Sequence, residues 1–329
     1  MKKTFKRILC IVLAAVLVAS LAGCAKINYI TNGTIKAINE VKSGDWKNGG
    51  AEGGEEGGAS DINKDDIKIE ELTPGTYGGV DFQNLEDVAK FYKEAYDYTK
   101  SLTADYIDDQ GATQKFYKLL GDEKLKIGDV IIDGSANAIV NKLVPGIVDS
   151  MFKPNIYGLP PCYNRNPDLD NNKDDEHKKA DHDFRTTEIT AEDILAANVK
   201  DNGDGTITLV IQPKMAQMST RGDDSQGRFF EVLGDIGGVV AGIKAVSFTE
   251  GTAEDNVKVY YKGGKVTVKV DAKSKEILEG DYVMETTVQV DHASVAVIKD
   301  KSATLTITYI NHYPASDQYL KDTKGVTRK

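Results

Sequence analysis

The chain has 329 residues, of which 40% are hydrophobic and 28% are charged, and its formal net charge at pH 7 is -10. This composition is typical of a folded acidic protein and excludes an extended disordered chain as its main state. A negative surface repels phosphate groups, which argues against nucleic acid as a partner.

Residues 1–23 have the pattern of an export signal. A basic segment, residues 2–7, precedes an apolar run, residues 8–21. This run is too short to cross a hydrocarbon core of ~30 Å as a helix, so it predicts a leader and not a membrane span.

The apolar run ends in Leu21-Ala22-Gly23-Cys24, which resembles the lipobox of bacterial lipoproteins. In that family a peptidase cuts before the cysteine, whose thiol carries a diacylglycerol. The resemblance implies that Cys24 is the lipid-attachment residue and that the protein is held at the outer side of the cell membrane by two acyl chains. The leader and linker are most similar to those of Gram-positive (Firmicutes) lipoproteins. The alternative is an ordinary secretory signal that happens to end before a cysteine.

Cys162, within the expected domain, and Trp46, before it, are two further residues that could have a function. Cys162 is the one cysteine left after Cys10 is removed and Cys24 is modified, so no internal disulfide is expected. Its Pro-rich surroundings predict a half-buried thiol and not a nucleophile. Trp46 is the only tryptophan, and contact with the membrane interface is the alternative to a solvated position in the linker.

Residues 24–79 are predicted to be the lipidated N-terminus and a flexible linker. Residues 49–58 contain only glycine, glutamate and alanine. A flexible coil of about 35 residues would span on the order of 30 to 35 Å, enough to lift a domain from the headgroups.

An extracytoplasmic domain is expected over residues 80–315. Asn84 is a good N-cap, and apolar residues at spacings of three and four predict a helix over Leu85–Leu102. Short strands are predicted over Lys115–Leu120 and Leu125–Asp133.

The segment Ala138–Phe152 predicts a second, strongly apolar helix. Such a helix is either buried in the core or faces a hydrophobic ligand. The second interpretation would make one row of its side chains a ligand-binding face, namely Ile139, Leu143, Ile147 and Met151.

An acidic insertion occupies residues 164–183. An EF-hand loop starting at Asp168 would need glycine where Lys173 stands and a carboxylate where Lys179 stands, so the calcium interpretation fails. His177, Asp181 and His182 lack a preorganising frame for zinc. We therefore predict a solvated loop and no metal.

The pattern of the remaining domain residues mainly predicts strands. Thr190 opens a short helix with Asp193 as its capping-box partner, and residues 201–205 form a Gly-rich turn before the strand Thr206–Gln212. From Val257 onward, apolar and polar residues alternate through Tyr309, with Gly263-Gly264 as a predicted hairpin turn. Residues 316–329 are predicted to be a polar tail.

These elements predict an α+β fold in which helices cover one face of a curved antiparallel sheet. Their order resembles the ectodomains of uncharacterised Firmicutes lipoproteins, for which no activity can be transferred.

No catalytic motif or cofactor-binding pattern occurs, and His292 and His312 are expected to be satisfied histidines on a sheet face. We therefore expect no enzyme, but a non-catalytic binding or interaction module whose ligand could be a lipid, a glycan or a protein. The alternative is a carrier of lipids or small hydrophobic molecules with an apolar cavity between sheet and helices, and an enzyme with an unrecognised motif stays open.

Overall fold

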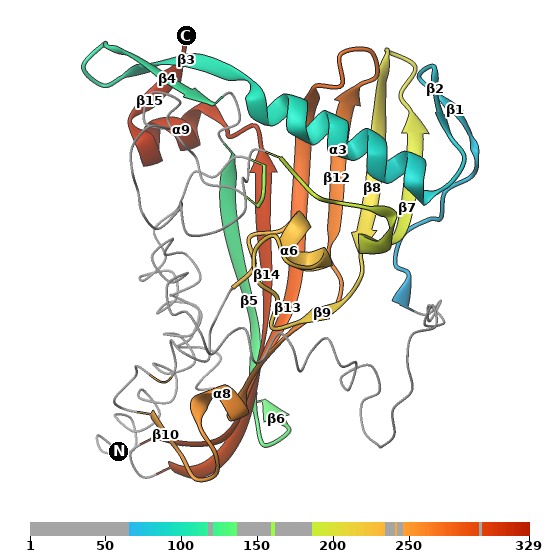
Figure 1. Ribbon diagram of the computed structural model, residues 1–329. Coiled ribbons are helices and arrows are strands. Elements are labelled where there is room, and N and C mark those ends of the chain that lie inside the picture. Colours follow the sequence, from blue (N-terminus) through green and yellow to red (C-terminus); the bar gives the residue numbers. More distant parts are fainter. Residues whose placement is uncertain are drawn as a thin grey trace.

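The computed structural model describes residues 66–117, 121–136, 159–161, 186–233, 241, 246–295 and 298–329. The fold is α+β, with a large open antiparallel sheet and helices against one of its faces (Figure 1). The predicted fold class is therefore confirmed.

The main sheet is a path of antiparallel strands. Within the described residues its order is β6-β5-β14-β13-β12-β8-β7. The strands of this path are β5 (Asp122–Ile132), β6 (Ser135–Ala136), β7 (Ile194–Asp201), β8 (Thr206–Pro213), β12 (Lys265–Asp271), β13 (Ile277–Val295) and β14 (Ile298–Tyr313).

Strand β13 is long enough to pair with more than one strand on the side opposite β14. Beyond β12 it pairs with β11 (Val257–Tyr261) and then with β10 (Val246–Phe248). Strand β9 (Ala216–Gln217) pairs with the outer edge of β11, and the short helix α8 (Ala253–Asn256) leads into β11.

Helix α3 (Leu85–Ser101) lies across the main sheet, as the sequence predicts (Figure 1). The Asn84 side chain accepts a hydrogen bond from the backbone N–H of Asp87, which caps the helix. Its apolar stripe faces the sheet and includes Val88, Phe91, Tyr92, Ala95 and Tyr96, all of them buried.

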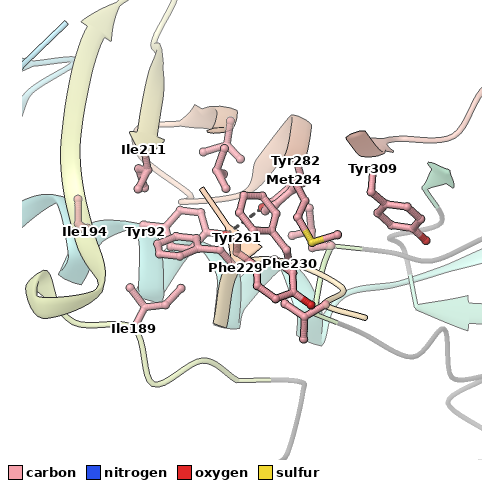
Figure 2. Packing of buried hydrophobic residues seen from close by; sticks show 14 of the residues in the cluster. Tyr92, Ile189, Ile194, Ile211, Phe229, Phe230, Tyr261, Tyr282, Met284 and Tyr309 are labelled. Atoms are coloured by element: carbon pink, nitrogen blue, oxygen red, sulfur yellow. Dashed lines mark hydrogen bonds between the residues drawn. The ribbon is translucent and has the colours of Figure 1, made fainter. Parts of the chain in front are cut away.

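The core fills the space between α3, α6 (Ser225–Phe229) and the sheet. Tyr92 lies against Phe229, with ring centroids 5.5 Å apart, and its hydroxyl is 3.0 Å from that of Tyr282 on β13 (Figure 2). Phe230 and Tyr261 are also fully buried in this cluster. The covered face of the sheet is thus packed with large aromatic side chains.

The predicted hairpin at Gly263-Gly264 is wrong. Strands β11 and β12 do not pair with each other but both pair with β13, one after the other along its length. Tyr261 is opposite Thr286 and Lys265 is opposite Val283, so three residues face two. The glycines form a β-bulge in one nearly continuous strand, because the long β13 offers a partner to both halves.

The predicted polar tail also contains secondary structure. Helix α9 (Asp317–Lys324) is followed by β15 (Val326–Arg328), which joins β3 (Thr103–Asp108) and β4 (Thr113–Tyr117) in a three-stranded sheet. Leu320 and Val326 are buried there in a second cluster with Tyr106 and Ala315.

Residues 66–79 belong to the folded unit, although the sequence pattern places them in the linker. The backbone N–H of Lys68 donates to Gln212 Oε1 at 2.8 Å, and Gln212 Nε2 donates to the Asp66 carbonyl at 2.7 Å. Strand β1 (Gly75–Tyr77) then pairs with β2 (Val80–Phe82).

Other predicted elements agree with the structure. The capping box at Thr190 opens a 3₁₀ turn, η4 (Ala191–Asp193), and the segment 201–205 is a turn between β7 and β8. The leader, the Gly-rich segment, the helix Ala138–Phe152 and the acidic insertion 164–183 lie outside the described residues.

Candidate binding face

The main sheet has a second face, which we call the open face. In β12 the residues between buried Val266, Val268 and Val270 are exposed or half-exposed. The same alternation holds in β11, where Lys258 and Tyr260 lie between buried residues. Because side chains alternate along a strand, these residues point away from the core.

The register brings residues of the open face into rows across the sheet. Tyr260 on β11 is opposite Gln217 on β9 and Thr287 on β13. Thr287 is in turn opposite Thr306 on β14. Residues directly opposed on paired antiparallel strands share a face, so these four side chains form one row.

A neighbouring row contains Lys258 on β11, Gln289 on β13 and Thr304 on β14, each directly opposite the next. Apart from Lys258 at the β11 edge, the two rows form a surface without formal charge, which we call the neutral patch: Gln217, Tyr260, Thr287, Gln289, Thr304 and Thr306. Thr306 is exposed and the other five are half-exposed. The patch lies over four strands, of which β13 and β14 form one hairpin and β9 and β11 come from earlier parts of the chain.

The hydroxyl groups of the neutral patch are available for a ligand. Within the described residues, no hydrogen bond joins the side chains of Thr287, Thr304 or Thr306 to another group of the protein. Each threonine hydroxyl can donate one hydrogen bond and accept two. A flat surface thus offers several unused donors and acceptors.

Tyr260 is the aromatic residue of the patch. Lys262 Nζ lies 5.3 Å from its ring centroid, a cation–π contact at one face of the ring. Partial burial, and secondarily the charge of Asp291, raise the pKa of the Tyr260 hydroxyl. The phenol therefore stays neutral at physiological pH and can both donate and accept.

Charged residues surround the neutral patch in strand-wise stripes. Lys265 and Lys269 lie on β12, and Glu279, Asp281 and Glu285 lie on β13. His312 on β14 is opposite Asp281, with its Nδ1 2.7 Å from Asp281 Oδ1. Lys269 pairs with Asp204 at 3.3 Å, and charges of both signs occur on this face.

A buried polar cluster near η4 is a second candidate site. Arg228 forms two hydrogen bonds with the Asp193 carboxylate, at 2.8 and 3.0 Å, and Arg221 pairs with Glu231. Asp224 accepts hydrogen bonds from Ser219 and from the backbone of Gly227. These charges are paired inside the protein, so the cluster holds η4, α6 and the following loop together and offers no accessible reacting group.

Of the residues that the sequence singles out as candidate site residues, only His292 and His312 lie within the described residues. Cys24, Trp46, Cys162, His177, Asp181 and His182 lie outside the described residues, as do Ile139, Leu143, Ile147 and Met151. His292 and His312 lie on β13 and β14 with carboxylate partners, as predicted for satisfied histidines on a sheet.

Sequence reasoning missed the neutral patch. The alternation of β11 indicates that Tyr260 is on a solvent-exposed face, but nothing in the pattern reveals which strands flank β11.

The described residues hold no group of three or more His, Cys, Asp or Glu side chains that could bind a metal ion. In the described ranges no helix has both the length and the apolar character needed to cross a membrane.

Comparisons with protein-family models, with curated proteins and with solved structures give no match to this chain.

Proposed function

We propose that this protein is a non-catalytic binding module, anchored to the outer side of the cell membrane by a diacylglyceryl group on Cys24, which captures its ligand on the open face of the sheet. The leader and the tetrapeptide at residues 21–24 support the anchor. The difference between the two faces of the sheet supports the binding surface.

One observation carries this proposal. The strands that bury Val266, Val268 and Tyr261 under α3 and α6 present threonine, glutamine, tyrosine and charged residues on the opposite face. Because the helices and the core cover one face of the sheet, the open face is the one that a ligand can reach.

The anchor is tested with Cys24→Ala. We expect this variant to leave the membrane fraction or to accumulate as an uncleaved precursor, because the acyl chains have no attachment point. Cys162→Ala is the matched control and should fractionate as the unchanged protein does. Unaltered membrane fractionation of Cys24→Ala would refute the anchor.

The binding surface is tested by cosedimentation of the purified full chain, in nonionic detergent, with Gram-positive cell envelopes. Thr287→Arg/Thr306→Arg places two charged side chains on the open face and should reduce the bound fraction at least tenfold. Glu86→Arg/Lys90→Glu, which changes exposed residues of α3, should bind unchanged. Equal binding of all three proteins would contradict the use of the open face.

The carrier hypothesis is the alternative, and it depends on the apolar segment Ala138–Phe152, outside the described residues. Native mass spectrometry of the full chain distinguishes the two hypotheses. A lipid mass that copurifies and leaves on delipidation would favour a carrier, whereas a clean apo mass that gains nothing from added membrane lipids would favour the binding module.

A further inference from the structure

The neutral patch is an uncharged area within a strongly charged protein. Lys258 on β11 borders it opposite Gln289, Lys262 borders it just after β11, and Glu285 and Asp291 flank it along β13. Charges of both signs at its border oppose a polyanion and a polycation alike. The complement of such an area is a ligand that is polar but has no charge.

The hydrogen-bonding groups of the patch point to the same class of ligand. Three threonine hydroxyls, two glutamine amides and one phenol converge on it, and the threonine hydroxyls have no partner within the described residues. These groups both donate and accept, as the hydroxyl groups of a sugar do. An apolar ligand would cover these groups without giving them hydrogen-bond partners, which is unfavourable.

Tyr260 supplies an aromatic ring in the first row, between Gln217 and Thr287. Its ring already attracts the Lys262 ammonium at 5.3 Å, so the electron-rich face of the ring is not buried in the core. Tyrosine combines an apolar face with a polar tip, which suits a ring that is apolar on one side and hydroxylated at its edge.

The dimensions of the patch suit a chain of such rings. Neighbouring strands are ~4.8 Å apart and successive outward side chains along a strand are ~6.7 Å apart, so one row spans several sugar units. The row ends at Gly128 on β5, where an added Cβ would lie 3.3 Å from Thr306 Cβ. Because glycine has no side chain, nothing projects from the open face at Gly128, and a long ligand can continue across β5.

We propose that the neutral patch binds an uncharged polysaccharide, with one sugar ring on Tyr260 and neighbouring units hydrogen-bonded to Thr287, Thr306 and Gln217. This inference rests on the proposed function and assigns the ligand class of the open face.

The test is native affinity electrophoresis of the full chain in nonionic detergent, in gels that contain dextran, mannan, xylan or mixed-linkage β-glucan. We expect at least one of these neutral polymers to retard the protein. Tyr260→Ala should weaken retardation tenfold or more, because a few aromatic anchors carry most of the binding energy of such surfaces. Tyr260→Phe keeps the ring and should retain most of the retardation.

A second pair of variants guards against loss of folding. Thr306→Lys introduces a charge at an exposed position of the patch and should abolish retardation. Thr267→Lys makes the same change on the open face of β12, outside the patch, and should have no effect. Equal retardation of these two variants would overturn the proposal.

The remaining outcomes separate this inference from the proposed function. No retardation in any neutral polymer, or retardation only in polygalacturonate, would overturn the polysaccharide assignment. If envelope binding is still lost in Thr287→Arg/Thr306→Arg, the open face remains the binding surface for another ligand. If envelope binding is unaffected, the proposed function itself fails.

Discussion

Asp224 is a carboxyl group whose burial opposes its charge. It caps α6 by accepting a hydrogen bond from the Gly227 backbone N–H at 2.9 Å, and it accepts a second from the Ser219 hydroxyl. Burial raises its pKa above the ordinary value of 3.8, although both hydrogen bonds act in the opposite direction. The ionised form is therefore disfavoured in the folded state relative to the unfolded state.

We predict that Asp224→Asn is as stable as the unchanged protein, or more stable, at pH 7. Asparagine keeps the capping oxygen and removes the buried charge, whereas Asp224→Ala removes the cap and should cost about 1 kcal/mol. Because the folded-state pKa is raised, the carboxyl contributes stability below pH 3.8 that is lost as the pH rises through the raised pKa. The advantage of asparagine should thus shrink on acidification.

Urea unfolding of the three proteins at pH 7 and near pH 4 measures these differences. A loss of stability at pH 7 that is equally large for Asp224→Asn and Asp224→Ala would mean that burial does not penalise the carboxylate.

His292 joins three segments at the far end of the β13–β14 hairpin. Its Nδ1 is 2.8 Å from Asp300 Oδ1 on β14, and its Nε2 is 3.8 Å from Glu250 Oε2 in the loop after β10. The hydrogen bond to Asp300 raises the pKa of His292 above 6.5, and the charge of Glu250 adds to this effect. The histidine carbonyl also accepts the Thr249 N–H at 2.9 Å.

We predict that this end of the hairpin loosens as the solution becomes alkaline. A raised histidine pKa contributes stability below pH 6.5 that is lost as the pH rises through the raised value. Hydrogen exchange of the Thr249 amide, corrected for its intrinsic rate, should therefore be slower at pH 6 than at pH 8. Asp300→Asn is the control: its His292 should titrate closer to 6.5 by NMR, and its exchange should depend less on pH.

At the scale of elements, the junction of β11 and β12 depends on one glycine. Gly264 has a φ of +96°, and a Cβ there would lie 2.5 Å from the Val283 carbonyl oxygen of β13. Gly134, in the turn after β5, has a φ of +76° but no atom within 4 Å of an added Cβ. Both positions have a positive φ that would strain an alanine, and they differ in the close approach of a neighbouring strand.

We predict that Gly264→Ala destabilises the protein by about 2 kcal/mol more than Gly134→Ala does. Both variants carry the cost of an alanine at positive φ, of order 1 kcal/mol, but Gly264→Ala must also push β12 away from β13. Thermal and urea unfolding of the pair give the difference. Equal costs would argue that the bulge does not bring the two backbones together.

Local patterns predicted individual elements well, and pairings poorly. Helix α3 was predictable because the cap at Asn84 and the apolar spacing agree. The alternation in β11 and β12 was equally clear, yet it is the same for a hairpin and for a bulged continuous strand. The choice between them depends on the length of β13, which pairs with both. Helix α9 was missed because a short, polar helix buries little more than Leu320.

The candidate site was not predictable for a related reason. Tyr260 and Thr306 lie in separate strands and meet only through the register of β11, β13 and β14. Periodicity assigns each of them to a polar face, but it cannot say which polar faces adjoin or which side of the sheet α3 covers. Neighbourhood across a sheet is a property of topology and not of local sequence.

At the scale of the whole molecule, the described folded unit begins well before its first long element. Gln212 is 2% exposed, and both of its amide atoms are bonded to the backbone of residues 66 and 68. The Gly78 N–H donates to Asp201 Oδ2 at 2.8 Å, which fastens the following turn to the end of β7. If Cys24 carries the proposed anchor, the linker between it and the folded unit comprises only the residues before 66.

We predict that a chain starting at residue 66 unfolds at the same temperature as one starting at residue 25, whereas a chain starting at residue 80 is less stable by roughly 2–4 kcal/mol. The shorter chain loses β1 and leaves Gln212 without its partners, and an unsatisfied buried polar group alone costs about 1–3 kcal/mol. Gln212→Met in the chain starting at residue 80 should recover part of the loss, because it removes the orphaned amide while it fills a similar volume. Thermal and urea unfolding of the four chains provide the measurement. If the chains starting at residues 66 and 80 unfold alike, residues 66–79 do not contribute to the stability of the folded unit and belong to the linker.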